Sequence, residues 1–309
     1  MVKLVLMGSG AFGLPTYRRL AGAHEIGLVV TQPDRPAGRG RTLTATPVGA
    51  WAEDAGLPLL KTENVSRDDI DRVRSVEADA WVVIAFGQKL SQGLLADRFA
   101  VNLHASRLPR WRGAAPINHA VLAGDAVTGN SVITLAERMD AGLVLGQSER
   151  VIEPRQTAGE LHDLLAEDGP ELVEAVLARH AAGATTAEEQ DEALVTLAGK
   201  LDKKRDGWVD ISASADECRQ RINGLSPWPS ATVSFRGAAL KLLRAEPAAG
   251  GAEEAGVFID AGSGVVSCGE GALRVLEAQA PGKPAMEWSR VAQSLGVRDG
   301  ERLEGSEPC

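Results

Sequence analysis

Residues 3–31, KLVLMGSGAFGLPTYRRLAGAHEIGLVVT, decide the fold class of this chain. They begin and end with apolar runs at 3–8 and 26–31, and a helical pattern lies between these near 12–22. Further segments of the same two kinds follow: a helical pattern near 47–56 and apolar runs at 80–85 and 99–104. Apolar strands that alternate with helices are typical of a parallel sheet covered on both faces. The sequence therefore predicts an α/β, Rossmann-like domain with a doubly wound, mostly parallel sheet.

From about residue 203 the pattern changes to short strand-like runs separated by Gly, Pro and Ser. Five or six such runs lie between residues 230 and 282, and a series of short strands at about 8–12-residue spacing is typical of a small barrel. We therefore predict a closed or half-closed, OB-like β-barrel. The tail GERLEGSEPC (300–309) lacks such a run, and we expect it to be a frayed end.

The length of 309 residues corresponds to about two domains. A helical pattern at 158–183 closes the first part, and the polar run TTAEEQDEALVT (185–196) has little apolar periodicity. The predicted organisation is a Rossmann-like domain at 1–186, a linker at 187–202 and an OB-like domain at 203–309.

The composition excludes several classes of protein. Hydrophobic residues make up 44% of the chain and charged residues 24%, and no apolar run approaches the ~18 residues that a membrane span needs. The N-terminal run becomes glycine-rich too early for a signal peptide, so we expect a cytoplasmic protein. Cys218, Cys268 and Cys309 form no CxxC pair, which argues against a disulfide framework and a cysteine zinc site. We expect no metal.

The charge of the chain is unevenly distributed. A net charge of -9 argues at first against a nucleic-acid partner, because Lys and Arg that neutralise phosphates supply most of that affinity. Residues 1–112, however, contain 15 Lys and Arg against 11 Asp and Glu, whereas residues 113–309 contain 18 against 31. The acidic total therefore does not exclude nucleic acid.

The turn GSGAFG (8–13) matches G-x-G-x-x-G between a strand and a helix, as in a dinucleotide-binding fingerprint. That fingerprint also needs an acidic residue at the end of the second strand, where this chain has Thr31 and Gln32. A nicotinamide-dependent oxidoreductase is therefore an alternative that rests on this motif alone. Otherwise the glycines form a tight turn.

The loop TQPDRPAGRGRTLTATP (31–47) is too long for an ordinary connection between a strand and a helix. It contains Arg35, Arg39 and Arg41, and its prolines and glycines lead us to expect no regular structure. Closely spaced arginines can hold phosphates, and the alternative is a solvated surface loop.

The segment FAVNLHASRLPRWRGAAPINHA (99–120) carries the strongest functional signal. Asn102 and His104 lie two residues apart at the end of a strand, so their side chains point to the same side at the edge where doubly wound sheets bind ligands. An amide and an imidazole presented together can hydrogen-bond the oxygen that becomes negative when a carbonyl is attacked. The following basic loop leads into a helix that starts at Pro116, which suits an anion.

Asp140 lies in the turn MDAG (139–142) between two strand-like runs. Aspartate in such a position is ordinarily a turn former. If its carboxylate approached His104, it would stabilise the imidazolium and accept the proton that the reaction releases.

On these residues the chain resembles the methionyl-tRNA formyltransferases, a family of the 10-formyltetrahydrofolate-dependent formyltransferase superfamily. The motifs that carry the resemblance appear in the order of that family over nearly the whole chain: TQPDRPAGRG, N-x-H with S-x-LPRWRGAAPI, MDAG, ALVTLAGKL and SPWP. The resemblance implies direct transfer of a formyl group from 10-formyltetrahydrofolate to the α-amino group of initiator methionyl-tRNA. It also implies that loop 31–47 contacts the acceptor stem and that the second domain follows the tRNA backbone. We expect a monomer.

The family's functional positions are implied residue by residue. Catalytic roles fall on Asn102, His104 and Asp140. Folate binding falls on Ser106, Arg107, Leu108 and Pro109, with the pterin near Phe86, Gly87, Gln88, Lys89 and Leu90. The positions expected to bind tRNA are Arg35, Arg39, Arg41, Lys200, Lys203, Lys204 and Arg205.

Three positions depart from the family's usual pattern. Arg107 replaces a usual leucine, Ser226 a usual asparagine, and the turn is MDAG instead of LDTG or LDGG. Arg107 is neutral if only the backbone faces the folate, and otherwise contacts the folate glutamate tail or the tRNA. Two further alternatives stay open: a formyltransferase that acts on an amino sugar, and an RNA-binding module without catalysis.

Overall fold

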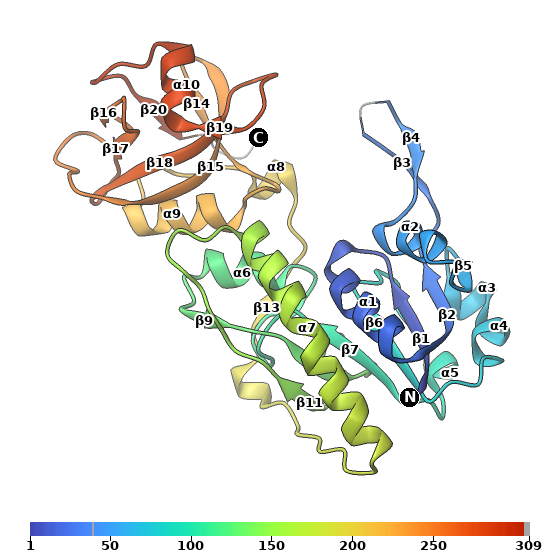
Figure 1. The fold of residues 1–309 in the computed structure, drawn as a ribbon. Coiled ribbons are helices and arrows are strands. Elements are labelled where there is room, and N and C mark those ends of the chain that lie inside the picture. Colours follow the sequence, from blue (N-terminus) through green and yellow to red (C-terminus); the bar gives the residue numbers. More distant parts are fainter. Residues whose placement is uncertain (39, 306–309) are drawn as a thin grey trace. The chain divides into compact units, whose positions relative to one another are not determined.

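The computed structural model describes residues 1–38 and 40–305. Figure 1 shows its elements in chain order. Contacts between residues divide the chain into two compact units, each built from three segments. Unit 1 comprises Met1–Arg112, Gly129–Arg150 and His162–Leu197, and unit 2 comprises Gly113–Thr128, Val151–Leu161 and Ala198–Cys309. The linear boundaries at residues 186 and 203 stay a prediction. Within the described residues, no helix combines the length and apolar character of a membrane span.

Unit 1 contains a seven-stranded sheet, and the predicted doubly wound fold is confirmed. In spatial order its strands are β11 (Val144–Gln147), β10 (Ser131–Thr134), β7 (Ala100–His104), β6 (Ala80–Ile84), β1 (Lys3–Gly8), β2 (Glu25–Thr31) and β5 (Leu59–Lys61). The five strands from β7 to β5 are parallel, whereas β10 runs antiparallel to both of its neighbours, β7 and β11. Strand β6, AWVVI, is buried at every position, as expected for a sheet covered on both faces.

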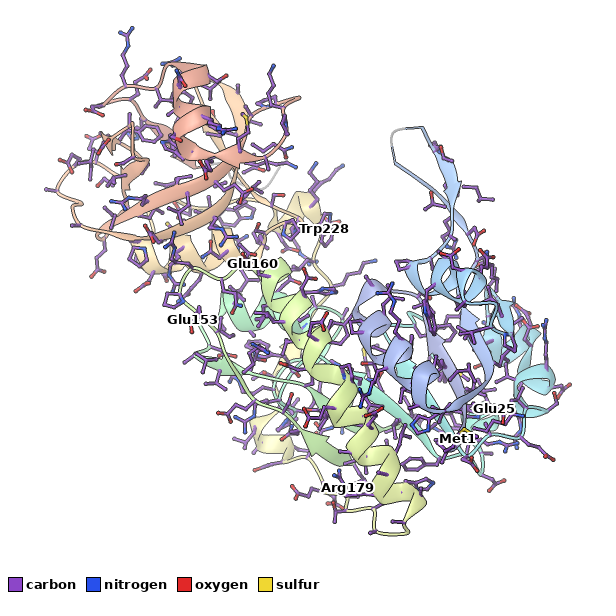
Figure 2. The ribbon with its side chains drawn as sticks, in the orientation of Figure 1. Met1, Glu25, Glu153, Glu160, Arg179 and Trp228 are labelled. Atoms are coloured by element: carbon purple, nitrogen blue, oxygen red, sulfur yellow. The ribbon has the colours of Figure 1, made fainter. Side chains whose placement is uncertain are left out.

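The helices of the first 181 residues lie between the strands or after them, with α6 and the start of α7 in segments of unit 2. They are η1 (Ala11–Gly13), α1 (Leu14–Ala23), α2 (Pro47–Asp54), α3 (Val65–Asp68), α4 (Ile70–Arg74), α5 (Gln92–Leu95), α6 (Pro116–Leu122) and α7 (Ala158–Ala181). Proline opens α2 and α6, where its missing N–H is not needed. The Thr46 hydroxyl caps α2 by accepting from the Gly49 N–H at 2.9 Å. In Figure 2, Glu160 marks the first turn of α7 and Arg179 its last. The predicted helices near 12–22, 47–56 and 158–183 are confirmed.

The glycines of GSGAFG make room for Tyr17. A Cβ added at Gly8 would lie 2.6 Å from both the Ile84 carbonyl oxygen and the Tyr17 hydroxyl, and one at Gly13 would lie 2.9 Å from the Tyr17 ring. The Tyr17 hydroxyl donates to the Met7 carbonyl at 2.8 Å, and the side chain is fully buried. Burial raises the pKa of Tyr17. Packing of this tyrosine against the sheet accounts for Gly8 and Gly13.

The prediction of no regular structure between residues 31 and 47 is wrong. Strands β3 (Arg35–Ala37) and β4 (Thr42–Thr44) pair as an antiparallel hairpin. The β-branched threonines of β4 favour extended backbone, and left-handed Gly38 and Arg41, with φ of 69° and 50°, turn the chain between the strands. Figure 1 shows the hairpin extending away from α2. We call it the arginine hairpin.

Unit 2 contains an antiparallel, half-barrel sheet, which confirms the predicted OB-like class. Its strands in spatial order are β16 (Phe258–Asp260), β17 (Val265–Ser267), β18 (Ala272–Gln279), β15 (Ala238–Ala248), β14 (Ala231–Phe235) and β20 (Leu303–Gly305), and β19 (Met286–Glu287) pairs with β18. The rings of Phe235, Phe258 and Trp288 pack together in its core. The remaining short elements are β8 (Arg112–Gly113), β9 (Val127–Thr128), β12 (Arg150–Val151), η2 (Glu192–Leu194), β13 (Leu197–Ala198), α8 (Lys203–Asp206), α9 (Ala215–Gly224) and α10 (Trp288–Leu295).

The expectation of a frayed tail is wrong for residues 303–305. These residues form β20, which pairs with β14, and Leu303 is 1% exposed in the barrel core. A single buried leucine among polar neighbours leaves no alternating pattern, which explains why the sequence does not predict this strand.

Candidate active site

The side chains of His104 and Asp140 come together at the carboxyl edge of the parallel sheet. His104 ends β7, and Asp140 lies in the turn between β10 and β11. The His104 Nδ1 lies 3.6 Å from Asp140 Oδ2, and the two side chains are 7% and 15% exposed. The sequence spacing could not decide whether Asp140 approaches His104, and the structure shows that it does. Their catalytic roles stay predictions.

A backbone carbonyl orients the His104 ring. The ring Nε2 lies 2.9 Å from the Trp111 carbonyl oxygen. Because a carbonyl only accepts, Nε2 carries the hydrogen of this bond. The other nitrogen, Nδ1, is the one that faces the Asp140 carboxylate and is available to a reacting group. An imidazolium with its second proton on Nδ1 would be stabilised by this carboxylate.

Asn102 lies on β7 opposite Ile133 of β10 and is half-buried. Within the part of the chain that the structure describes, its amide has no side-chain hydrogen-bond partner. Asn102 and His104 alternate with the buried Leu103, so both point to the same side of the sheet. The amide is therefore available as a donor beside the imidazole.

The Asp140 turn is tightly constrained. Asp140 has a left-handed backbone with φ of 54°. A Cβ at Gly142 would lie 1.7 Å from the Thr134 carbonyl oxygen, so only glycine fits there. The Thr134 hydroxyl accepts from the Leu143 N–H at 2.9 Å. The short sequence MDAG thus reflects close packing of the turn against the end of β10.

Strands β10 and β11 support the loop that is predicted to bind folate. The Ser131 hydroxyl donates to the Ser106 carbonyl at 2.6 Å and accepts from the Leu108 N–H at 3.0 Å. The Gln147 amide donates to the Leu108 carbonyl at 2.8 Å. The Leu108–Pro109 bond is cis, and Leu108 is 4% exposed. Neither Ser131 nor Gln147 is among the predicted site residues. The only sequence signal for Ser131 is its position as the polar residue that begins the apolar run SVIT (131–134).

Arg107 points away from this buried loop. Its guanidinium lies 2.7 Å from the Glu149 carboxylate, and the two side chains are 45% and 61% exposed. An exposed pair of this kind contributes little to stability, roughly 0–1 kcal/mol. The substitution of arginine for leucine is therefore accommodated at the surface.

The predicted pterin segment is held by residues from three connections. The Phe86 carbonyl accepts from the Ser9 hydroxyl at 3.2 Å and from the Gln32 amide at 2.9 Å. The Gln88 side chain accepts from the Val65 N–H and donates to the Thr62 carbonyl. These bonds position the backbone of 86–88, including Gly87 with its φ of 74°. Lys89 is exposed and Leu90 is half-buried.

The residues predicted to bind tRNA occupy both units. On the arginine hairpin, Arg35 forms an exposed ion pair with Glu63 at 2.7 Å, Arg41 is exposed, and Arg39 lies outside the described residues. In unit 2, Lys200, Lys203 and Lys204 are exposed. Arg205 donates to the Lys200 carbonyl and pairs with Asp206, whose hydrogen bond raises the pKa of Arg205.

A buried arginine lies next to the site. Arg112 follows Trp111 and is 3% exposed, and its guanidinium donates to Gln190 Oε1 and pairs with Glu192, both at 2.9 Å. Hydrogen bonds from Arg112 and then from Arg138 lower the pKa of Glu192. Sequence reasoning missed Gln190, because a glutamine in a polar run carries no pattern.

Two comparisons of sequence place this chain among known proteins. The formyl transferase family model matches residues 4–177, and the model for the formyl transferase C-terminal domain matches residues 202–296. The methionyl-tRNA formyltransferase of Acidiphilium cryptum is 41% identical over 98% of this chain and 100% of its own length. That of Magnetococcus marinus is 38% identical over 97% and 98%.

Solved structures share the fold. The sugar 3N-formyl transferase WlaRD, determined with dTDP and 5-N-formyl-THF, has a TM-score of 0.69 at 13% identity and covers 92% of this chain and 99% of its own. HypX from Aquifex aeolicus in complex with tetrahydrofolic acid has a TM-score of 0.67 at 15% identity over 96% of this chain. This chain spans about half of HypX, at 48%.

Proposed function

The chain belongs to the formyl transferase family, among the methionyl-tRNA formyltransferases, and from this premise we propose that it formylates initiator methionyl-tRNA. The formyl donor is 10-formyltetrahydrofolate, which is consumed as a co-substrate. Near-complete coverage of relatives named methionyl-tRNA formyltransferase, together with the match of this chain to both family models, supports this function. Within the site, the observation that best supports formyl transfer is the contact between His104 and Asp140, with Asn102 on the same strand as His104.

We propose direct transfer of the formyl group. The neutral α-amine of the methionyl ester attacks the formyl carbon, a C–N bond forms, and the bond from that carbon to N10 of the folate breaks. Asn102 and the Nδ1 side of His104 donate to the oxygen that becomes negative. Asp140 stabilises charged His104 and helps to remove the proton that the amine loses, and N10 gains a proton as it leaves.

The folate is proposed to lie between the two loops described above. Ser106, Arg107, Leu108 and Pro109 form one side, and Phe86 to Leu90 form the other. Ser131 of β10 holds the backbone of residues 106–108, and residues of neighbouring connections hold the 86–88 segment, so carbonyl and N–H groups in both loops can be presented in defined directions. Arg107, paired with Glu149 at the surface, is assigned no contact with the pterin.

The tRNA is proposed to contact the arginine hairpin through Arg35, Arg39 and Arg41, and the start of the second domain through Lys200, Lys203, Lys204 and Arg205. We also propose that the protein acts in the cytoplasm, as a monomer and without a metal.

The test is formylation of charged initiator tRNA with 10-formyltetrahydrofolate, followed on acid gels with elongator methionyl-tRNA as a control substrate. Loss of one oxyanion donor typically lowers the rate by about 10²–10³, so Asn102→Ala and His104→Ala should each fall at least that far. His24→Ala, a histidine at the end of α1, is the matched control and should keep the wild-type rate. Absence of formylated tRNA with the wild type would overturn the function, whereas formylation of an amino sugar instead would favour that alternative.

A further inference from the structure

Residues 188–196, within the stretch predicted to be a linker, form hydrogen bonds with the segments that carry His104 and Asp140. At one end, Glu188 and Val144 exchange backbone hydrogen bonds of 2.8 and 2.9 Å. At the other end, the Thr196 carbonyl accepts from the Arg112 N–H at 2.9 Å. The segment is therefore hydrogen-bonded to the turn that carries Asp140 and to the loop that orients His104.

Gln190 holds the Asp140 turn. Its Nε2 donates to the carbonyls of Asp140 and Gly142 at 2.7 and 2.8 Å. Its Oε1 accepts from Arg112 Nε at 2.9 Å. The orientation of the amide is determined by its partners, because arginine only donates and carbonyls only accept. Since Arg112 is buried and paired with Glu192, Gln190 is anchored on one side while it holds the turn on the other.

Thr196 holds the loop that orients His104. The Thr196 hydroxyl accepts from the Trp111 N–H at 2.9 Å. Trp111 has a left-handed backbone with φ of 63°, and its carbonyl is the group that accepts from His104 Nε2. Thr196 is thus two hydrogen bonds away from the imidazole.

We propose that Gln190 and Thr196 are positioning residues that set the distance and angle between His104 and Asp140. Neither needs to contact a substrate. The inference rests on the proposed function, in which His104 and Asp140 take part in formyl transfer. Because a misplacement of about 1 Å in a site can cost ~10²-fold in rate, the loss of either contact should be visible in turnover.

Gln190→Ala should lower kcat roughly 10- to 100-fold and leave the KM values for both substrates within about twofold of the wild type. Gln190→Glu tests the direction of the bonds, because it keeps an acceptor for Arg112 while it removes both donors to the turn. We expect it to be as slow as Gln190→Ala. Gln156→Ala, which removes a glutamine side chain that accepts from the Glu153 N–H, is the control and should be unchanged.

A double-variant comparison separates positioning from a general structural role. If Gln190 acts through Asp140, adding Gln190→Ala to Asp140→Ala should lower kcat by less than about twofold further. For Thr196, the isosteric Thr196→Val loses the acceptor and should be slow, whereas Thr196→Ser keeps it and should recover most of the rate. The proposal would be overturned if the fold-losses in kcat of Gln190→Ala and Asp140→Ala multiplied in the double variant. It would also be overturned if Thr196→Val had the wild-type kcat.

A measurement without substrates distinguishes this proposal from the proposed function. In protein labelled with ¹⁵N at histidine, the His104 Nδ1 resonance should move in Gln190→Ala in the same direction as in Asp140→Ala, and Gln156→Ala should leave it in place. If the wild type formylates no tRNA but the resonance moves, the function fails and the positioning role stands. If it does not move, the positioning role is wrong whatever the activity.

Discussion

At Gly8 the first strand comes so close to Tyr17 and Ile84 that only glycine fits. Packing therefore explains the first glycine of a motif that is typical of dinucleotide binding. In the candidate site the same principle applies to Gly142, where close contact with Thr134 allows no side chain. Gly8 and Gly142 thus lie where a neighbouring group comes too close for a side chain, and substitution of either should cost stability.

Gly8→Ala should destabilise the protein by about 1–3 kcal/mol, because the added methyl group overpacks a buried contact. Gly22→Ala is the matched control, since Gly22 lies on an exposed face of α1 with nothing within 4 Å of an added Cβ. Alanine there should stabilise by about 0.4–1 kcal/mol. Thermal unfolding of the three proteins measures both effects. Equal melting temperatures for Gly8→Ala and the wild type would contradict the packing explanation. In a separate titration, saturable binding of a nicotinamide dinucleotide would favour the oxidoreductase alternative.

At the scale of elements, the sequence predicts what is buried and periodic. The apolar strands β1, β2, β6 and β7 and the long helix α7 have sequence patterns that follow from which of their residues are buried. The arginine hairpin and β20 were mispredicted because short, exposed strands bury almost nothing, so that turn geometry and pairing with a neighbour decide their conformation. In the site, the N-x-H spacing was predictable from the strand period. Gln190 and Thr196 were not, since their role comes from tertiary hydrogen bonds.

The arginine hairpin provides the prediction at this scale. Replacing Arg35 and Arg41 with alanine should weaken tRNA binding and lower the slope of log affinity against log salt by about one unit for each lost phosphate contact. Glu63 does not prevent this contact, because its pair with Arg35 is exposed and such pairs are weak. Filter binding over a range of salt concentrations measures the slope. Arg67→Ala, which removes an exposed arginine paired with Asp68, is the control. An unchanged slope and affinity in the double variant would show that the hairpin does not bind phosphates.

At the scale of the whole molecule, the net charge of -9 describes no particular surface. The basic excess of residues 1–112 includes the arginine hairpin and the loop predicted to bind folate, while the acidic excess follows later in the chain. Local positive charge is sufficient to attract tRNA, because exposed charges separated by more than about 10 Å are largely screened at physiological salt. A modest local field also suits an enzyme that releases its product after each turnover.

The composition of unit 2 provides the last prediction, which also tests the linear domain boundaries. Helix α6, far earlier in the chain, belongs to this unit: Asn118 donates to the Gly224 carbonyl at 2.8 Å, and Leu122 lies against Gly224 of α9. A fragment of residues 198–309 keeps the core around Phe235, Phe258 and Trp288 and should fold. It should lose about 2 kcal/mol from the uncovered α9 contact, which corresponds to about 10 °C in melting temperature for a domain of this size.

Hydrogen exchange of the β15 amides compares the fragment with the full chain. We expect faster exchange in the fragment, and a peptide of residues 113–128 added in trans should slow it again, whereas a peptide of the same composition in scrambled order should have no effect. Equal protection in the fragment and in the full chain would mean that α6 adds no stability to the barrel. In that case a boundary near residue 203 would describe the second domain better than the three-segment unit does, since the contacts with residues 113–128 would carry no measurable free energy.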